Sequence, residues 1–140
     1  MTVYDCCRKD VVTASPDAKV MEIIHIMDDK NVGSVVIIEQ KKPVGILTDR
    51  DIVLRVVNRN KDPNMTNVRD VMTKNPTVLR GEMGLFDALR QMKGKHFRRI
   101  PVVNGGGQLS GIITVDDLMR LLIRELSCVA TVLEEQTPDI

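Results

Sequence analysis

The fold is decided by the eight-residue stretch GILTDRDI at residues 45–52, which returns as GIITVDDL at residues 111–118. Both copies read glycine, two aliphatic residues, threonine, two variable residues, aspartate and a further aliphatic residue. This order predicts a buried strand that turns directly into a helix, with the threonine as N-cap and the aspartate in the first turn. We call each turn a corner. A hydroxyl, a carboxylate and unpaired backbone N–H groups would meet at each corner.

Each corner has two interpretations. Threonine followed three residues later by aspartate is a capping box, which needs nothing beyond a helix start. Alternatively, the backbone N–H groups at a helix start bind phosphate, and a nearby carboxylate can accept the hydroxyls of a ribose. A single copy would favour the capping box, whereas repetition of the whole surrounding unit favours a nucleotide site.

The composition narrows the class of protein. With 140 residues, the chain can hold one domain or two small halves that share a core. Apolar residues make up 43% of it and aromatic residues 2%, so the core is expected to be aliphatic. The 20 basic and 19 acidic residues leave a net charge of +1, which argues against nucleic acid as a partner. No apolar run reaches the roughly 20 residues of a membrane span, and no secretory signal is visible.

The three cysteines do not form a disulfide framework, because their number is odd and two of them, Cys6 and Cys7, are adjacent. Reduced thiols and a cytoplasmic location are therefore expected. Together with Cys128, His25 and His96 they match no zinc spacing, so we expect no metal site. No nucleophile with a base and an orienting third group is readable, so we expect no catalytic residues and no enzyme activity.

The corners belong to a longer internal repeat, in which each copy is expected to hold a short strand, a helix, two strands and a helix. A unit of about 60 residues is marginal for independent folding. Two copies packed sheet against sheet would bury the aliphatic strands of both, so we expect one α/β domain with pseudo-twofold symmetry. The expected elements are a helix started by Ser15-Pro16-Asp17, strands at 34–38, 44–47, 99–103 and 109–113, and helices at 49–57, 85–92 and 115–135.

The ordered series of strands 34–38 and 99–103 with both corners resembles the CBS domain, and its tandem repeat resembles a CBS pair, also called a Bateman module. The resemblance extends from about Thr2 to Arg124. It implies a regulatory module that binds adenosyl ligands in clefts between the repeats and associates as a homodimer. We expect the chain to divide into CBS repeat 1 with its lead-in (1–62), a linker (63–67), CBS repeat 2 (68–126) and a helix extension with a tail (127–140).

The resemblance also implies site residues, because in such modules the corner aspartate holds the ribose diol and the corner threonine lies near phosphate. The first cleft would use Val12, Val32, Gly33, Ile46, Thr48, Arg50, Asp51, Arg98 and Arg99. The second cleft would use Thr77, Phe97, Arg98, Ile112, Thr114, Asp116, Asp117 and Ser34.

The expected charges of the two clefts differ. Arg98 and Arg99 would meet phosphate in the first cleft, whereas the second would borrow the uncharged Gly33 and Ser34. Asp116 stands in the second cleft where Arg50 stands in the first. We therefore expect the first cleft to bind a phosphorylated adenosine more tightly. The second would be empty or prefer a cationic or less charged adenosyl compound.

The expected function is thus the sensing of AMP, ADP or ATP on behalf of a separate, unknown effector protein, without a cofactor, a metal or a membrane. A sensor of S-adenosylmethionine or NAD, or a purely structural dimerisation module without ligand, are the alternatives. A stripe of apolar residues in the last helix is longer than the repeat needs, and we interpret it as a dimer contact. The stripe consists of Leu118, Leu122, Leu126, Val129 and Leu133.

Overall fold

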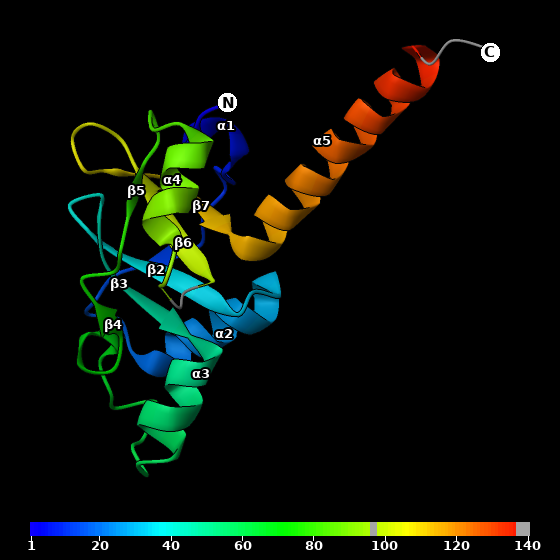
Figure 1. Ribbon diagram of the computed structural model, residues 1–140. Coiled ribbons are helices and arrows are strands. Elements are labelled where there is room, and N and C mark those ends of the chain that lie inside the picture. Colours follow the sequence, from blue (N-terminus) through cyan, green and yellow to red (C-terminus); the bar gives the residue numbers. More distant parts are fainter. Residues whose placement is uncertain (96–97, 137–140) are drawn as a thin grey trace.

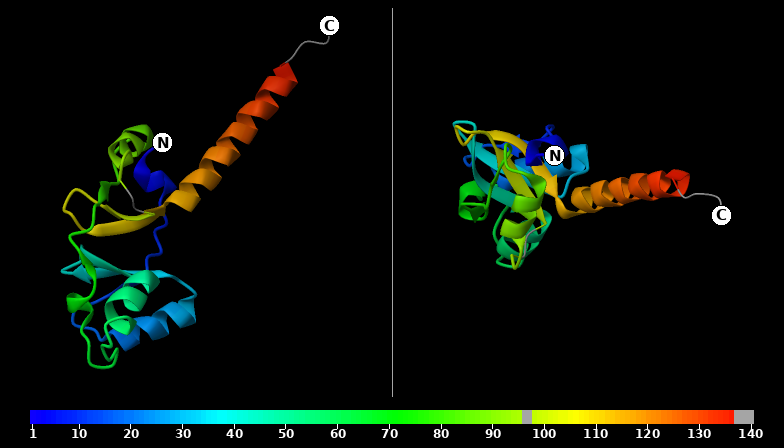
Figure 2. Two further views of the ribbon diagram at one scale, coloured as in Figure 1. Left: turned by 60° about the horizontal axis from the view of Figure 1, so that its bottom comes forward. Right: turned by 45° about the horizontal axis from the view of Figure 1, so that its top comes forward.

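The computed structural model describes residues 1–95 and 98–136 and contains two small mixed sheets. Figure 1 shows the elements, and the left view of Figure 2 shows the sheets stacked with helices on their outer sides. The first sheet has the order β1 (Thr13–Ala14), β2 (Ser34–Glu39), β3 (Lys42–Thr48) and β4 (Thr73–Lys74). The second has the order β5 (Leu79–Arg80), β6 (Arg99–Val103) and β7 (Leu109–Thr114).

The two sheets repeat one pairing scheme. In each, a short first strand runs parallel to the second, and the second runs antiparallel to the third. The helices are α1 (Val3–Cys6), α2 (Val20–Lys30), α3 (Asp49–Ile52) with a π-helical continuation (Val53–Val57), a 3-10 turn (Val68–Asp70), α4 (Leu85–Met92) and α5 (Val115–Gln136). The predicted α/β pair of β-α-β-β-α repeats is confirmed.

The start of α2 corrects one expectation, because Ser15-Pro16-Asp17 form a turn and not the start of a helix. The Asp17 N–H donates to Ser15 Oγ at 3.2 Å, and α2 begins later, at Val20. A side-chain cap is dispensable there, because the Val20 N–H donates to the carbonyl of Thr66 at 3.0 Å. The segment between the repeats thus supplies the helix cap.

The two repeats exchange the segments that lead into them. Residues 1–8 pack on the second repeat: Val3 and Cys7 lie in its core, and the Leu85 N–H at the start of α4 donates to the carbonyl of Met1 at 3.1 Å. Residues 66–74 pack on the first repeat in the same way, with Val68 in its core. We call residues 1–8 and 66–74 the lead-ins. Their exchange ties the two repeats into one folded unit. The boundaries expected at residues 62, 67 and 126 stay predictions.

Two aliphatic cores follow from this exchange. Both consist of strand residues, one face of a helix and the exchanged lead-in. The first core contains Val20, Ile23, Val35, Ile37, Leu47, Ile52, Val56, Val68, Val71 and Met72. The second contains Val3, Cys7, Leu79, Leu85, Ala88, Ile100, Val102, Ile113 and Leu118.

Candidate functional site

The first corner is a complete capping box at the end of β3. The Asp51 N–H donates to Thr48 Oγ1 at 3.1 Å, and the Thr48 N–H donates back to Asp51 Oδ2 at 3.0 Å. The other carboxylate oxygen, Oδ1, faces Arg55 Nη2 at 3.8 Å, which is beyond hydrogen-bond distance. The first corner therefore forms the capping box that its sequence predicts. Asp51 Oδ1 remains available to accept a hydrogen bond from a further donor.

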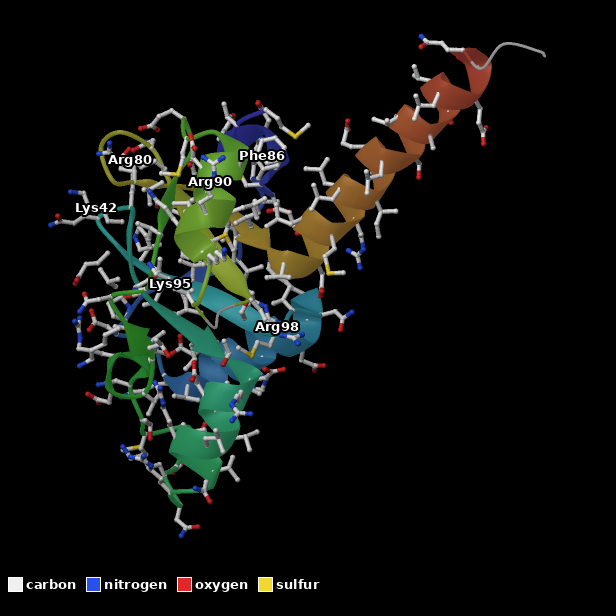
Figure 3. All side chains as sticks on the ribbon, in the orientation of Figure 1. Lys42, Arg80, Phe86, Arg90, Lys95 and Arg98 are labelled. Atoms are coloured by element: carbon white, nitrogen blue, oxygen red, sulfur yellow. The ribbon has the colours of Figure 1, made fainter. Side chains whose placement is uncertain are left out.

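A cavity of about 460 Å³ lies beside this corner. Its walls come from the first corner, from the segment that leads into the second repeat and from the beginning of β6. Figure 3 shows Arg98, just before β6, where the edges of the two sheets meet. The cavity is lined by Ile46, Thr48, Asp49, Arg50, Asp51, Thr73, Asn75, Pro76, Thr77, Arg98 and Arg99.

The second corner borders two smaller openings of about 230 and 260 Å³, which share Arg8, Arg99 and Thr114. The smaller opening is lined by Arg8, Asp10, Val11, Val12, Asn31, Val32, Gly33, Ser34, Val36, Arg99, Ile112 and Thr114. The other is lined by Arg8, Arg98, Arg99, Thr114, Val115, Asp116, Asp117 and Arg120. We call the two openings together the second cleft and the cavity beside Asp51 the first cleft.

The structure divides four residues between the clefts differently from the prediction. Thr77, expected in the second cleft, lines the first, and Val12, Val32 and Gly33, expected in the first, line the second. The exchange of lead-ins is the physical reason, because each cleft is bounded by the corner of one repeat and the segment that enters the other. Phe97 and the neighbouring His96 lie outside the described residues.

The remaining expected residues lie where they were predicted. The first cleft brings together Ile46, Thr48, Arg50, Asp51, Arg98 and Arg99. The second brings together Ser34, Arg98, Ile112, Thr114, Asp116 and Asp117. Whether these residues bind a nucleotide stays a prediction.

The second corner differs from the first in the partner of its carboxylate. The Asp117 N–H donates to Thr114 Oγ1 at 3.0 Å, as in the first corner. The Asp117 carboxylate, however, accepts two hydrogen bonds from Arg8, from Nε at 2.9 Å and from Nη2 at 3.0 Å. Arg120 Nη1 adds an ion pair at 3.5 Å. Both carboxylate oxygens of the second corner are therefore engaged by guanidinium groups.

The backbone holds Arg8 in this position. The Arg8 N–H donates to the Ile112 carbonyl and the Ile112 N–H donates to the Arg8 carbonyl, both at 2.8 Å. Burial alone would raise the pKa of Asp117, but the hydrogen bonds from Arg8 and Thr114 outweigh it, and the net pKa is lowered. The hydrogen bonds to the Asp117 carboxylate and its negative charge raise the pKa of Arg8. The ion pair thus stabilises the charged form of both partners.

The sequence prediction missed Arg8, although the repeat contains a signal for it. Arg8 aligns with Thr73 when the two lead-ins are superimposed, and Thr73 lines the first cleft as Arg8 lines the second. The second cleft is lined by the uncharged Gly33 and Ser34 from the other repeat, as expected, but Arg99 lines this cleft as well as the first. The difference between the clefts comes from Arg8.

The cysteines are free thiols: Cys7 is buried, Cys6 is half-buried and Cys128 is exposed. Burial raises the pKa of Cys6 and Cys7, which keeps both thiols protonated. Within residues 1–95 and 98–136, no group of three or more histidine, cysteine or acidic side chains could hold a metal ion. Nor does any helix in these ranges combine the length and apolar character needed to cross a membrane.

Comparison with known proteins gives consistent matches. Residues 3–58 and 68–124 each match the CBS domain family. An uncharacterised protein of Methanopyrus kandleri, MK0525, is 37% identical over 136 residues, which cover 96% of this chain and 68% of the relative.

Two solved structures are similar over most of their length. The CBS domain pair of protein MJ0100, in complex with 5-methylthioadenosine and S-adenosyl-L-methionine, has a TM-score of 0.77 at 25% identity, covering 89% of this chain and 98% of that one. CBSX2 in complex with AMP has a TM-score of 0.74 at 27% identity, covering 88% and 96%.

Proposed function

The chain belongs to the CBS-domain family as a tandem CBS pair, and from this premise we propose that it senses an adenine nucleotide (AMP, ADP or ATP) in its first cleft. The observation that carries the proposal is that the Asp51 carboxylate, with Oδ1 beyond hydrogen-bond distance of Arg55, lines the same cavity of about 460 Å³ as Arg98 and Arg99. Cavities of this size are typical of small-molecule sites. The AMP-bound CBSX2 and the MJ0100 pair with its adenosyl ligands support the ligand class.

Each part of the first cleft suits one part of a nucleotide. A carboxylate oxygen can accept the two hydroxyls of a ribose diol, and Asp51 Oδ1 is available for this. Guanidinium groups bind phosphate through charge-assisted, often bidentate hydrogen bonds, which assigns Arg98 and Arg99 to the phosphates. Apolar contacts from Ile46 and Pro76 suit the flat face of adenine.

The second cleft is proposed to bind adenine nucleotides weakly or not at all. A ribose diol there would compete with Arg8 for the Asp117 carboxylate, and it would have to replace two charge-assisted hydrogen bonds with neutral ones. A cationic adenosyl compound gains little here either, because Arg8, Arg98, Arg99 and Arg120 line the opening around Asp116 and Asp117.

The output of the module is proposed to be conformational. Because the first cleft lies between the corner of one repeat and the lead-in of the other, a bound nucleotide would bias how the two repeats sit against each other. A separate effector protein would respond to that difference. Location in the cytoplasm stays a prediction from the reduced thiols.

Calorimetric titration of nucleotide-free protein tests the proposal. AMP, ADP, ATP, S-adenosylmethionine and NAD are titrated into the wild type, Asp51→Ala and the matched control Asp117→Ala. We expect one site for AMP, ADP or ATP, with affinity about 100-fold lower in Asp51→Ala and unchanged in Asp117→Ala. Both variants lose one corner aspartate, and circular dichroism verifies that each remains folded.

Three results would contradict parts of the proposal. Wild-type affinity in Asp51→Ala would reject the assignment of the site. Preferential binding of S-adenosylmethionine or NAD would replace the nucleotide with one of these ligands. No binding at millimolar concentration would leave the corners as capping boxes in a structural module.

A further inference from the structure

Helix α5 extends well beyond the body of the protein. In Figure 1 and in both views of Figure 2, its C-terminal part stands away from both sheets. Only its beginning packs on the second core, where Leu118 is buried and Leu121 lies against the cluster. From Leu122 to Gln136 every residue of the helix is exposed. The packing of the repeats therefore does not account for the length of α5.

The exposed part of α5 is nevertheless patterned for burial. Met119, Leu122, Leu126 and Val129 follow the alternating spacing of three and four residues that forms the seam of a coiled coil. Ile123 and Val132 widen the stripe on its flanks. The exposed fractions are 56% for Met119, 36% for Leu122, 61% for Ile123, 68% for Leu126, 54% for Val129 and 48% for Val132. We call these six residues the α5 stripe.

The charges along the helix select the orientation of a partner. The end near the body carries Arg120, Arg124 and Glu125 and is basic on balance, whereas the far end carries Glu134 and Glu135 and is acidic. A second copy of the helix placed antiparallel would set the acidic end of each against the basic end of the other. A parallel copy would set like charges side by side. The acidic end also argues against an anionic membrane as the surface that covers the stripe.

We propose that α5 binds α5 of a second copy of this chain in antiparallel orientation, with the α5 stripe as the buried seam. A stripe with heptad spacing is complementary to itself, because the apolar residues of one helix fill the gaps between those of the other. This contact deepens the homodimer prediction and is independent of nucleotide binding in the first cleft.

Sedimentation equilibrium of the full chain tests the seam with a double variant, Leu126→Glu/Val129→Glu. Both side chains are more than half exposed in the monomer, so folding should be preserved, and circular dichroism checks it. We expect the oligomer mass to fall to half, with a dissociation constant raised about 100-fold or more. Thr131→Glu, on another face of the same helix, is the matched control and should assemble like the wild type. An unchanged mass in the double variant, or a monomeric wild type, would overturn the proposal.

Charge reversal tests the orientation. Arg120→Glu and Glu134→Arg should each weaken assembly, by about 2-fold to 10-fold, and the two changes combined should restore it, because antiparallel helices would again oppose unlike charges. A parallel pair gives no such rescue, since each residue would lie beside its own copy. Failure of the combined variant to recover would reject the antiparallel arrangement.

Discussion

The first and second corners have the same sequence pattern, and in each the aspartate N–H donates to the threonine hydroxyl, yet the two carboxylates have different partners. Asp51 lies in a complete capping box and keeps Oδ1 at 3.8 Å from its nearest guanidinium. Asp117 has both oxygens engaged by Arg8. The motif alone therefore does not define a binding site. The lead-in from the opposite end of the chain decides whether a corner can receive a ligand.

The largest expected effect comes from removing the group that distinguishes the corners. In Arg8→Ala, the Asp117 carboxylate loses its bidentate partner and keeps only the longer ion pair with Arg120. We expect calorimetry to detect a second AMP site, with affinity at least about 100-fold above that of the same cleft in the wild type. The stoichiometry should rise from one to two per chain.

Two variants control this experiment. Arg8→Ala/Asp117→Ala should lose the new site again, because the freed carboxylate is what creates it. Arg69→Ala removes another exposed ion pair, with Asp17 at 3.1 Å, and lines neither cleft, so it should bind like the wild type. If Arg8→Ala binds one nucleotide in the first cleft and no more, the comparison of the corners is wrong while the proposed function stands.

The corner glycines should differ in their effect on stability. A Cβ added at Gly111 would lie 2.7 Å from the carbonyl oxygen of Arg8, and this backbone atom is held by its pairing with Ile112. A Cβ at Gly45 would meet the Met72 side chain, which can change its rotamer. We expect Gly111→Ala to lower the free energy of unfolding by about 1–3 kcal/mol and Gly45→Ala to lower it by less, as measured in urea. Equal losses would contradict the assigned role of the Arg8 backbone.

The sequence predicted most of the fold, because the spacing of apolar residues and the turn residues between them determine strands and helices from nearby positions in the chain. Strands β2, β3, β6 and β7 and the two corners follow from aliphatic runs bounded by turns. The exchange of lead-ins has no local signature. It joins Arg8 to Asp117 across 109 positions, it caps α2 with Thr66 in place of Ser15, and it moves Thr77 to the first cleft. The membership of each cleft therefore required the tertiary structure.

Removing one phosphate-binding arginine should lower nucleotide affinity less, because the other arginine of the pair can still bind the phosphates. We expect Arg98→Gln and Arg99→Gln each to lower the affinity for ATP about 10-fold, and to leave the affinity for adenosine nearly unchanged. Arg80→Gln is the matched control, since Arg80 pairs with Glu82 at 3.7 Å and lines neither cleft. Figure 3 shows it away from Arg98. A parallel loss for ATP and adenosine would mean that the arginines support the fold of the cleft and do not bind phosphate.

The smallest expected effect is the pH dependence that the Arg8–Asp117 pair gives to folding. Because the folded pKa of Asp117 lies below its ordinary value of 3.8, the pair stabilises the fold above that value, and the stabilisation is lost as the pH falls through the folded pKa. The pair is partly exposed, so Asp117→Asn should cost at most about 1 kcal/mol at neutral pH. Urea unfolding at pH 7 and pH 3 should show this difference shrinking in acid. In the Arg8→Ala background, the stability cost of Asp117→Asn should depend less on pH. If that cost changes between pH 7 and pH 3 as much as it does with Arg8 present, then Arg8 is not the group that lowers the pKa of Asp117.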